Sequence, residues 1–197
     1  MSIVRIADKH DAAQVSDIYA PIVKETVISF EEQPPSAKEF EERILTTLTT
    51  HPWLVAEHNG ELMGYAYGST HSSRAAYRWS ANVSVYIAKA YRRRGVGRAL
   101  YTSLLHLLRA QGMYNAYAGI SLPNPGSQGL HESMGFTPVG VYKQVGFKFG
   151  QWVDVGWWEL PLCDRSIPDN PPVRFPDMCN SAECEQAIGI GTALLLK

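Results

Sequence analysis

Apolar and polar residues alternate along several short stretches of the chain, and between these stretches the apolar residues recur every three or four positions. Alternation is typical of strands, and the longer spacing is typical of amphipathic helices. The predicted strands cover 2–7, 53–58, 61–68, 79–87, 113–121, 137–145 and 152–160, and the predicted helices start after Asp8 or Asp11, run from 36 towards 48, and cover 95–111 and 127–134. Ser36 and Glu39 form a capping box at the start of the second helix, and Gly135 ends the last one.

Strands that alternate with helices from residue 79 onward predict an α/β protein. Asn59-Gly60 joins two apolar runs in the manner of a tight hairpin, so we expect part of the sheet to be antiparallel and the sheet to be mixed. The pattern ends at Cys163, after which the periodicity is interrupted by Pro168, Pro171, Pro172 and Pro176. We therefore expect one domain over 1–162 and a proline-rich, poorly ordered extension over 163–197, in which the apolar stretch 187–196 could dock on another surface.

The chain has 197 residues, of which 45% are hydrophobic and 19% charged, as in a folded soluble domain rather than a disordered chain. Its net charge is −1, so no bulk positive potential favours nucleic acid. No apolar run is long enough for a membrane span, and the N-terminal residues lack the pattern of an export signal. The cysteines, Cys163, Cys179 and Cys184, suggest neither a disulfide framework nor a zinc site. We expect a cytoplasmic protein without a metal and with neither nucleic acid nor a membrane as partner.

The segment from Val85 to Leu100 combines the end of a strand, a basic loop with glycines and the start of an amphipathic helix. Glycines let backbone N–H groups approach a ligand, free N–H groups at a helix start attract anions, and arginines add charge-assisted contacts to phosphate. The segment is neither a Walker loop nor a Gly-x-Gly-x-x-Gly dinucleotide loop. It predicts a phosphate-binding site. The alternative is a solvated basic helix start in which Gly95 serves only packing.

The order Arg92-x-x-Gly95-x-Gly97 resembles the pyrophosphate-binding motif of the GCN5-related N-acetyltransferases (GNAT). Further segments resemble, in order, the phosphinothricin N-acetyltransferase family of that superfamily: Tyr77-Arg78-Trp79, Ser84-Val85-Tyr86-Ile87, Leu122-Pro123-Asn124-Pro125, Leu130-His131-Glu132-Ser133-Met134-Gly135-Phe136, Val145-Gly146-Phe147-Lys148 and Trp152-Val153-Asp154-Val155-Gly156-Trp157-Trp158. The resemblance covers roughly residues 3–162 and leaves out the C-terminal extension.

The resemblance implies a GNAT fold, with a mixed central sheet of about seven strands flanked by about four helices. It also implies that acetyl-CoA is the co-substrate and lies where two neighbouring parallel strands splay apart. Main-chain groups of Val85, Tyr86 and Ile87 would then pair with the pantetheine arm. The other implied cofactor contacts are Arg92, Arg93, Arg94, Gly95, Val96, Gly97 and Arg98 for the pyrophosphate, and Asn124 and Ser127 for the arm.

In such enzymes the substrate amine attacks the thioester directly, which requires a base for the ammonium group and an acid for the departing thiolate. His131 stands where many members of the superfamily carry a tyrosine as the acid, and a histidine that titrates near neutral pH can do this work. The alternative is a helix histidine that only bonds a neighbouring strand. Relatives carry Glu or Asp as the base where this chain has Asn82. An amide has no basic lone pair near pH 7, so Asn82 could only orient the amine or a water, or a carboxylate such as Glu31 could substitute for the base.

The resemblance places Arg74, Tyr77, Phe30 and Glu31 near an amino-acid substrate, and the planar fork of an arginine suits a carboxylate or a phosphinate. We therefore expect an acetyl-CoA-dependent N-acetyltransferase that acts on the α-amine of a small amino-acid analogue. Phosphinothricin or methionine sulfoximine would be detoxified in this way. The alternatives are a catalytically weakened acyl-CoA-binding protein and a peptide or protein N-acetyltransferase. Relatives are usually homodimers, so a homodimer is expected.

Overall fold

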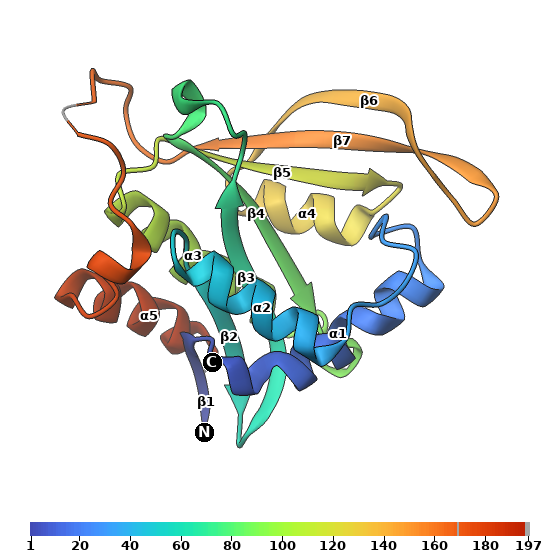
Figure 1. Ribbon diagram of the computed structural model, residues 1–197, viewed down its shortest axis with the longest axis horizontal. Helices are drawn as coiled ribbons and strands as arrows, with labels where there is room; N and C mark the ends of the chain where they lie inside the picture. The colour runs from blue at the N-terminus through green and yellow to red at the C-terminus, as the bar shows by residue number, and fades with distance from the viewer. Residues whose placement is uncertain (169, 196–197) are drawn as a thin grey trace.

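A seven-stranded mixed sheet forms the middle of the protein in the computed structural model, which describes residues 1–168 and 170–195 (Figure 1). The strands are β1 (Ser2–Ile6), β2 (Trp53–His58), β3 (Glu61–Thr70), β4 (Ser80–Ile87), β5 (Asn115–Leu122), β6 (Thr137–Lys148) and β7 (Gln151–Pro161). They lie in the order β1-β2-β3-β4-β5-β7-β6, and all neighbours are antiparallel except β4 and β5. The predicted mixed α/β sheet is therefore confirmed.

Helices cover both faces of the sheet. They are α1 (Ala12–Glu25), α2 (Ala37–Leu48), α3 (Val96–Ala110), α4 (Pro125–Ser133) and α5 (Ala182–Leu195). The predicted capping box of α2 is present, because Ser36 accepts from the Glu39 backbone N–H and the Glu39 carboxylate accepts in return. Helix α4 starts two residues earlier than predicted, because the side chain of Asn124 accepts from the backbone N–H of Ser127 and caps it.

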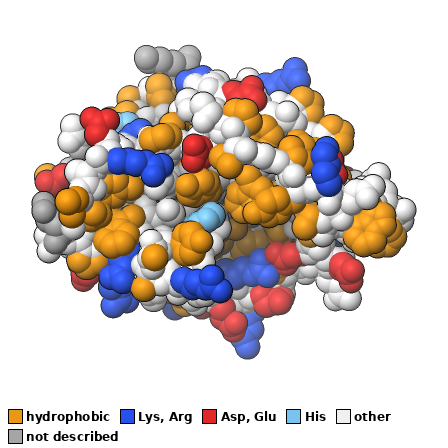
Figure 2. Space-filling view, turned by 90° about the horizontal axis from the view of Figure 1, so that it is seen from above, with side chains coloured by type: hydrophobic (Ala, Val, Ile, Leu, Met, Phe, Trp, Pro, Cys, Tyr) orange, Lys and Arg blue, Asp and Glu red, His pale blue; other side chains and the backbone are white. Residues whose placement is uncertain are grey.

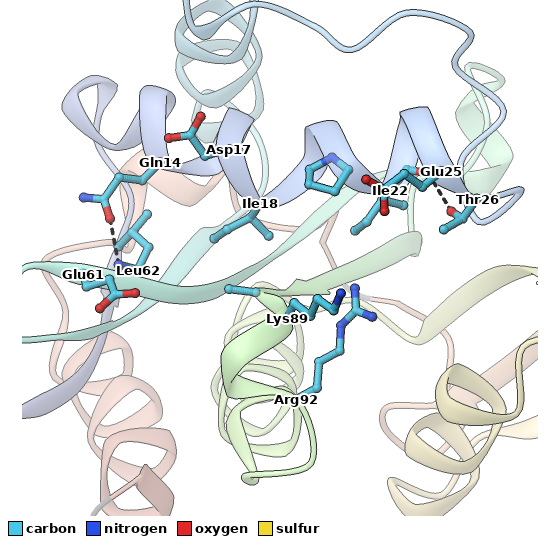
Figure 3. Close-up of a pocket in the computed structure, with 12 residues that line it drawn as sticks. Gln14, Asp17, Ile18, Ile22, Glu25, Thr26, Glu61, Leu62, Lys89 and Arg92 are labelled. Atoms are coloured by element: carbon cyan, nitrogen blue, oxygen red, sulfur yellow. Dashed lines mark hydrogen bonds between the residues drawn. The ribbon is translucent and has the colours of Figure 1, made fainter.

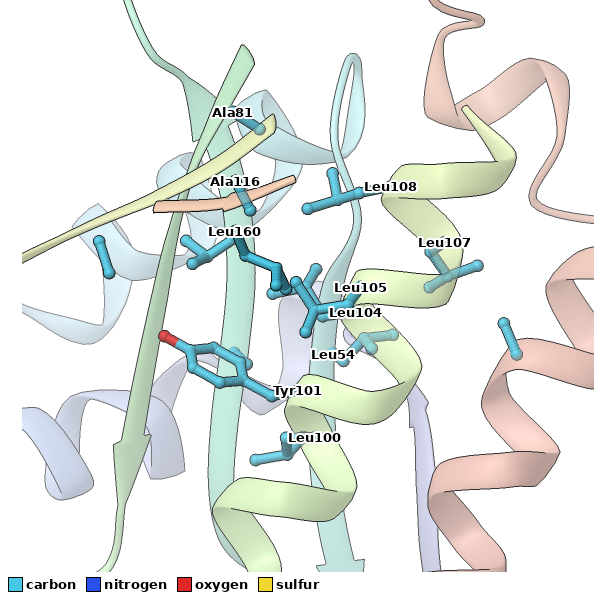
Figure 4. Close-up of a cluster of buried hydrophobic side chains, with 14 of the residues drawn as sticks. Leu54, Ala81, Leu100, Tyr101, Leu104, Leu105, Leu107, Leu108, Ala116 and Leu160 are labelled. Atoms are coloured by element: carbon cyan, nitrogen blue, oxygen red, sulfur yellow. The ribbon is translucent and has the colours of Figure 1, made fainter. Parts of the chain in front are cut away.

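The core has two parts, one on each face, because successive side chains of a strand point to opposite faces. In β2, Leu54 and Ala56 join the cluster under α3 and α5, whereas Trp53 and Val55 join the cluster under α1 and α2. The leucines of α3 belong to the first cluster: Leu104 and Leu108 point towards the strands, where Leu54 and Ala116 lie, and Leu107 points towards α5 (Figure 4). Burial on both faces makes the middle of the sheet a rigid support for the strand ends.

The two parallel strands diverge after a short paired stretch. Register between β4 and β5 is limited to Ser80↔Asn115, Ala81↔Ala116 and Asn82↔Tyr117. Beyond Asn82, β4 continues along β3 as far as Ile87, and β5 continues along β7 as far as Leu122. The backbone of 83–87 therefore has no strand partner on the β5 side. This is the splay that the sequence resemblance predicts.

The C-terminal segment differs from its sequence-based expectation. The sequence predicts a poorly ordered extension over 163–197, but α5 packs along α3 and β1, and this is the helix beyond the expected four. Phe175, Met178, Cys184 and Ala187 are buried in the main core. An added Cβ at Gly191 would lie 2.5 Å from the carbonyl oxygen of Ala99, so a glycine is what allows the two helix backbones to approach. Small residues thus let α5 cover α3; the last residue of the apolar stretch 187–196, Leu196, lies outside the described residues.

Candidate active site

The opening between β4 and β5 contains a small cavity of about 60 Å³. Its walls are Val83, Ser84, Val85 and Tyr86 of β4, Ala118, Gly119, Ile120 and Ser121 of β5, and Tyr101, Asn124, Ser127, His131 and Ile28 from the segments around them. The Ser121 hydroxyl is buried and has no hydrogen-bond partner within the described part of the chain. Unpaired backbone groups of β4 and a buried hydroxyl without a partner suit an extended ligand that carries amide groups.

The start of α3 has the geometry of an anion site. Gly95, at the N-cap, has a φ of 80°, and Arg93 has a φ of 60°. No side chain caps this helix among residues 1–168 and 170–195, so the backbone N–H groups of its first turn remain free. Free N–H groups and the positive end of the helix dipole favour a phosphate group here.

A larger cavity of about 500 Å³ joins the start of α3 to the splay. The predicted cofactor-binding residues that line this cavity are Val85, Tyr86, Ile87, Arg92, Arg93, Gly95, Val96, Gly97, Arg98, Asn124 and Ser127. Arg94 is the exception: its guanidinium lies over the ring of Tyr91, 5.8 Å from the ring centroid, and it does not line the cavity. One continuous cleft therefore offers a basic end for phosphates and a strand edge for an amide-bearing arm.

A second cavity of about 560 Å³ adjoins this cleft and shares Ile22 and Arg92 with it. It lies between α1 and the segment before α3. Lys89 and Arg92 point from that segment towards α1, where Glu25 lies (Figure 3). Because acidic and basic side chains face each other here, this part of the surface carries no net preference for an anion. The phosphate end of the cleft is thus limited to the start of α3.

His131 lies in the wall of the splay and is buried. Its Nδ1 lies 2.8 Å from the carbonyl oxygen of Ser127, which can only accept, so Nδ1 carries the proton. The hydroxyl of Tyr101 lies 2.9 Å from Nε2 and donates to it. Burial lowers the pKa of His131, so the ring is neutral at pH 7. Both ring nitrogens are engaged in this arrangement, and the predicted role of His131 as the acid for the thiolate stays a prediction.

Asn82 is the last residue of β4 that pairs with β5, and its Oδ1 lies 2.8 Å from Nδ1 of His71. The His71 ring is stacked on Tyr117, with ring centroids 4.6 Å apart, and the ring of Tyr77 lies 5.8 Å away. The structure thus brings two predicted residues, Asn82 and Tyr77, together around a histidine that the sequence analysis did not select. The register between β3 and β4 brings His71 to Asn82, because Thr70 pairs with Ala81 and His71 follows Thr70 directly. A correct prediction of this register is what the sequence analysis would have needed to select His71.

Comparison with known proteins gives the family. Residues 4–157 match the model of the acetyltransferase (GNAT) domain. The chain belongs to this family. A phosphinothricin N-acetyltransferase of Streptomyces viridochromogenes is 37% identical to it over 87% of this chain and 92% of that protein. An L-methionine sulfoximine/L-methionine sulfone acetyltransferase of Salmonella typhimurium is 34% identical over 84% of this chain and 98% of that protein.

The same family appears among solved structures. A GNAT superfamily phosphinothricin acetyltransferase from Sinorhizobium meliloti, in complex with acetyl-CoA, has a TM-score of 0.81 and 32% identity, over 90% of this chain and 97% of that chain. The GNAT fold and the resemblance to phosphinothricin acetyltransferases that the sequence predicts are confirmed. In the described ranges, no helix is long and apolar enough to cross a membrane.

Glu31 is engaged elsewhere in this GNAT protein and is poorly suited to replace the base. Its carboxylate accepts from both terminal nitrogens of Arg43, at 2.8 and 3.1 Å, and from the hydroxyl of Tyr19 at 3.0 Å. The Arg43 guanidinium lowers the pKa of Glu31, so the carboxylate remains ionised and paired near pH 7. Phe30 packs its ring over Gly146 of β6, where an added Cβ would lie 2.2 Å from that ring. Both residues therefore hold the loop between α1 and α2 in place.

Arg74 does not line the cleft. It lines a separate cavity of about 270 Å³ together with Arg78, and the opposite wall is formed by 171–174. Arg174 in that wall donates to the carbonyl oxygen of Thr49. The backbone carbonyl of Arg74 accepts from the backbone N–H of Tyr77 at 3.0 Å, but Arg74 lines this separate cavity and not the cleft, and its role in binding a substrate carboxylate stays a prediction.

Proposed function

We propose that this protein transfers the acetyl group of acetyl-CoA to the α-amine of a small amino-acid analogue, such as phosphinothricin or methionine sulfoximine. The observation that carries the proposal is the single cleft from the start of α3 to the splay, with Asn82 directly before the β4 residues that line the splay and His71 hydrogen-bonded to it. The names of the curated relatives support the class of substrate. Inactivation of a toxic amino acid, and the cytoplasmic location, stay predictions.

The residues of the chain divide this work between binding and chemistry. The free N–H groups at the start of α3, with Arg92 and Arg98, hold the pyrophosphate, and the open edge of β4 holds the pantetheine arm. The thioester then lies at the splay. The ammonium group loses one proton, and its nitrogen then bonds to the carbonyl carbon. As the C–S bond breaks, the nitrogen loses its second proton and the leaving thiolate takes up a proton. Alignment of the two reactants in one cleft supplies much of the rate.

The test is the release of free thiol from acetyl-CoA over a panel of amines: phosphinothricin, methionine sulfoximine, methionine sulfone, glutamate and a short peptide. We expect release with one or more of the amino-acid analogues and none with their N-acetylated forms. Heat of acetyl-CoA binding in calorimetry without release on any amine would instead favour an acyl-CoA-binding protein. Release confined to the peptide would favour a peptide or protein N-acetyltransferase.

We also propose a homodimer formed through the hairpin of β6 and β7. Along this hairpin large apolar side chains are exposed, with Phe147 at 58% and Trp152 at 61% of their surface. Figure 2 shows apolar side chains gathered on this side of the molecule, around a hollow near its middle. An exposed apolar surface of this kind is typical of a protein interface.

Replacing Phe147 and Trp152 together by glutamate is expected to convert the dimer to a monomer, because two buried charges without partners oppose association. The measurement is the mass in sedimentation equilibrium. Ile167→Glu is the matched control, since Ile167 is 90% exposed and lies outside the hairpin. A wild-type protein that sediments as a monomer at micromolar concentration would contradict the proposal.

A further inference from the structure

We propose that His71, held in place by Asn82, is the base that takes the proton from the substrate amine. The proposal rests on the proposed function, since it names the group that performs one of its two proton transfers. It also explains how a chain with an amide in the expected position of the base can still be an enzyme. The base has moved from β4 to the residue that follows β3.

The hydrogen bond between the two side chains fixes the tautomer of His71. Oδ1 of Asn82 is a carbonyl oxygen and can only accept, so Nδ1 of His71 carries the hydrogen in their 2.8 Å contact. In a neutral imidazole the other nitrogen, Nε2, then has a free lone pair. Nε2 makes no hydrogen bond within the described part of the chain, so this lone pair is available to a proton. Asn82 is thus a positioning residue that presents a basic nitrogen.

Asn82 and His71 lie next to the point where β4 and β5 separate. Asn82 pairs with Tyr117 at the last step before β4 and β5 separate, and the splay begins at the next residue. Alternation along the strands places Asn82, Ser84 and Tyr86 on one face of β4. The His71 ring stacks on Tyr117, and the Trp157 ring stands at 86° to it with the ring centroids 6.3 Å apart. The imidazole is therefore held by aromatic neighbours beside the point where β4 and β5 separate, half-buried and in reach of solvent.

The other candidate bases are engaged. Glu31 is paired with Arg43 and Tyr19, and both ring nitrogens of His131 have partners. His71 is different, because its single hydrogen bond leaves one nitrogen free. An imidazole is also the side chain whose protonation changes near neutral pH, which suits a base that must accept a proton and release it again in each cycle.

The ammonium N–H bond of the substrate breaks and its proton moves to Nε2 of His71, giving an imidazolium whose Nδ1 hydrogen remains on Oδ1 of Asn82. The freed lone pair of the amine forms the new C–N bond to the acetyl carbon, and the electrons of the C–S bond leave with the sulfur. The attacking nitrogen, which after C–N bond formation still carries one hydrogen more than the amide, loses that proton to the departing thiolate, and the imidazolium returns its own proton to solvent. No further oxidant, reductant or metal takes part.

The test compares His71→Phe, which keeps a ring on Tyr117 but removes the nitrogen, with the wild type. We expect kcat/KM for the amino acid to fall at least about 100-fold. The dissociation constant for acetyl-CoA in calorimetry is expected to remain unchanged.

The groups that face His71 are Asn82, Tyr77, Tyr117 and Trp157, with Glu159 and Arg165 acting on Tyr117 from further away. Because none of these is another imidazole, the pH dependence of kcat/KM that an imidazole base gives the wild type should be absent from His71→Phe.

A rescue variant and a spectroscopic measurement complete the test. Asn82→Glu added to His71→Phe places a carboxylate at the same point and should recover at least part of the lost rate. In wild-type protein, the nitrogen-15 signals of the neutral His71 ring should report a protonated Nδ1 and a bare Nε2, and Asn82→Ala should abolish this preference. A wild type that acetylates none of the amines overturns both this proposal and the proposed function. An active wild type matched within a few-fold by His71→Phe overturns only the role of His71.

Discussion

Substitution of Gly97 by valine is expected to raise the dissociation constant for acetyl-CoA by about 100-fold, which corresponds to the loss of one or two charge-assisted hydrogen bonds. Gly97 stands in the first turn of α3, where free N–H groups face the basic end of the cleft. An added Cβ at this position would already lie 3.0 Å from Leu130 and 3.9 Å from Ile87, which both line the cleft. The further carbons of valine fill the space that a phosphate group needs.

Calorimetric titration with acetyl-CoA measures this effect, and Gly129→Val is the matched control. Gly129 lies in α4, where an added Cβ meets nothing within 4 Å. The control should bind acetyl-CoA as the wild type does. Equal dissociation constants for Gly97→Val and the wild type would show that the start of α3 does not hold the pyrophosphate. The glycine would then serve only the packing of α3 against α4.

Substitution of Gly191 by valine is expected to lower the free energy of unfolding by about 3 kcal/mol, because it overpacks the contact between α3 and α5. An added Cβ there would lie 2.1 Å from the Ser103 hydroxyl and 2.5 Å from the Ala99 carbonyl oxygen. One of the two helices must therefore move away, and the core residues of α5, Cys184 and Ala187, lose contacts with it. The midpoint of thermal unfolding should fall by roughly 6–12 °C.

Gly189→Val is the control for this experiment. Gly189 lies two residues away in the same helix, but nothing lies within 4 Å of an added Cβ, so the two variants share the change in helix propensity and differ in packing. Chemical denaturation of both variants gives the difference in unfolding free energy. Equal losses would mean that the contact between α3 and α5 contributes little to stability, contrary to the packing described above.

Most of the sheet and four helices could be predicted from the sequence, because their signals are local. The capping box at Ser36, the turn at Asn59-Gly60 and the alternation along β4 each determine an element without reference to the rest of the chain. Helix α5 was missed for a physical reason. Its glycines lower helix propensity and prolines precede it, so its helical form depends on the surface of α3.

The candidate site likewise contains residues that local sequence motifs select and one residue that depends on contacts between strands. Residues of the cleft follow one another along β4 and the start of α3, and the motif therefore selects nearly all of them together. No sequence motif selects His71, because its closeness to Asn82 depends on the register between β3 and β4. The sequence reveals that a carboxylate is missing at Asn82, but only the paired strands show which side chain stands next to the amide. Arg94, in contrast, matches the motif but lies on Tyr91.

Helix α5 follows all strands and α1 to α4 in sequence, and this order has a consequence for how the protein is made. On the ribosome, the N-terminal strands and α3 emerge well before α5 is translated. The side of α3 that α5 covers remains exposed to solvent until then. Helix α5 also contacts β1, since Thr192 accepts a hydrogen bond from the backbone N–H of Val4 at 2.9 Å. Nascent chains stalled before residue 182 should therefore expose an apolar surface that attracts chaperones, and α5 covers this surface once it has been translated and has emerged.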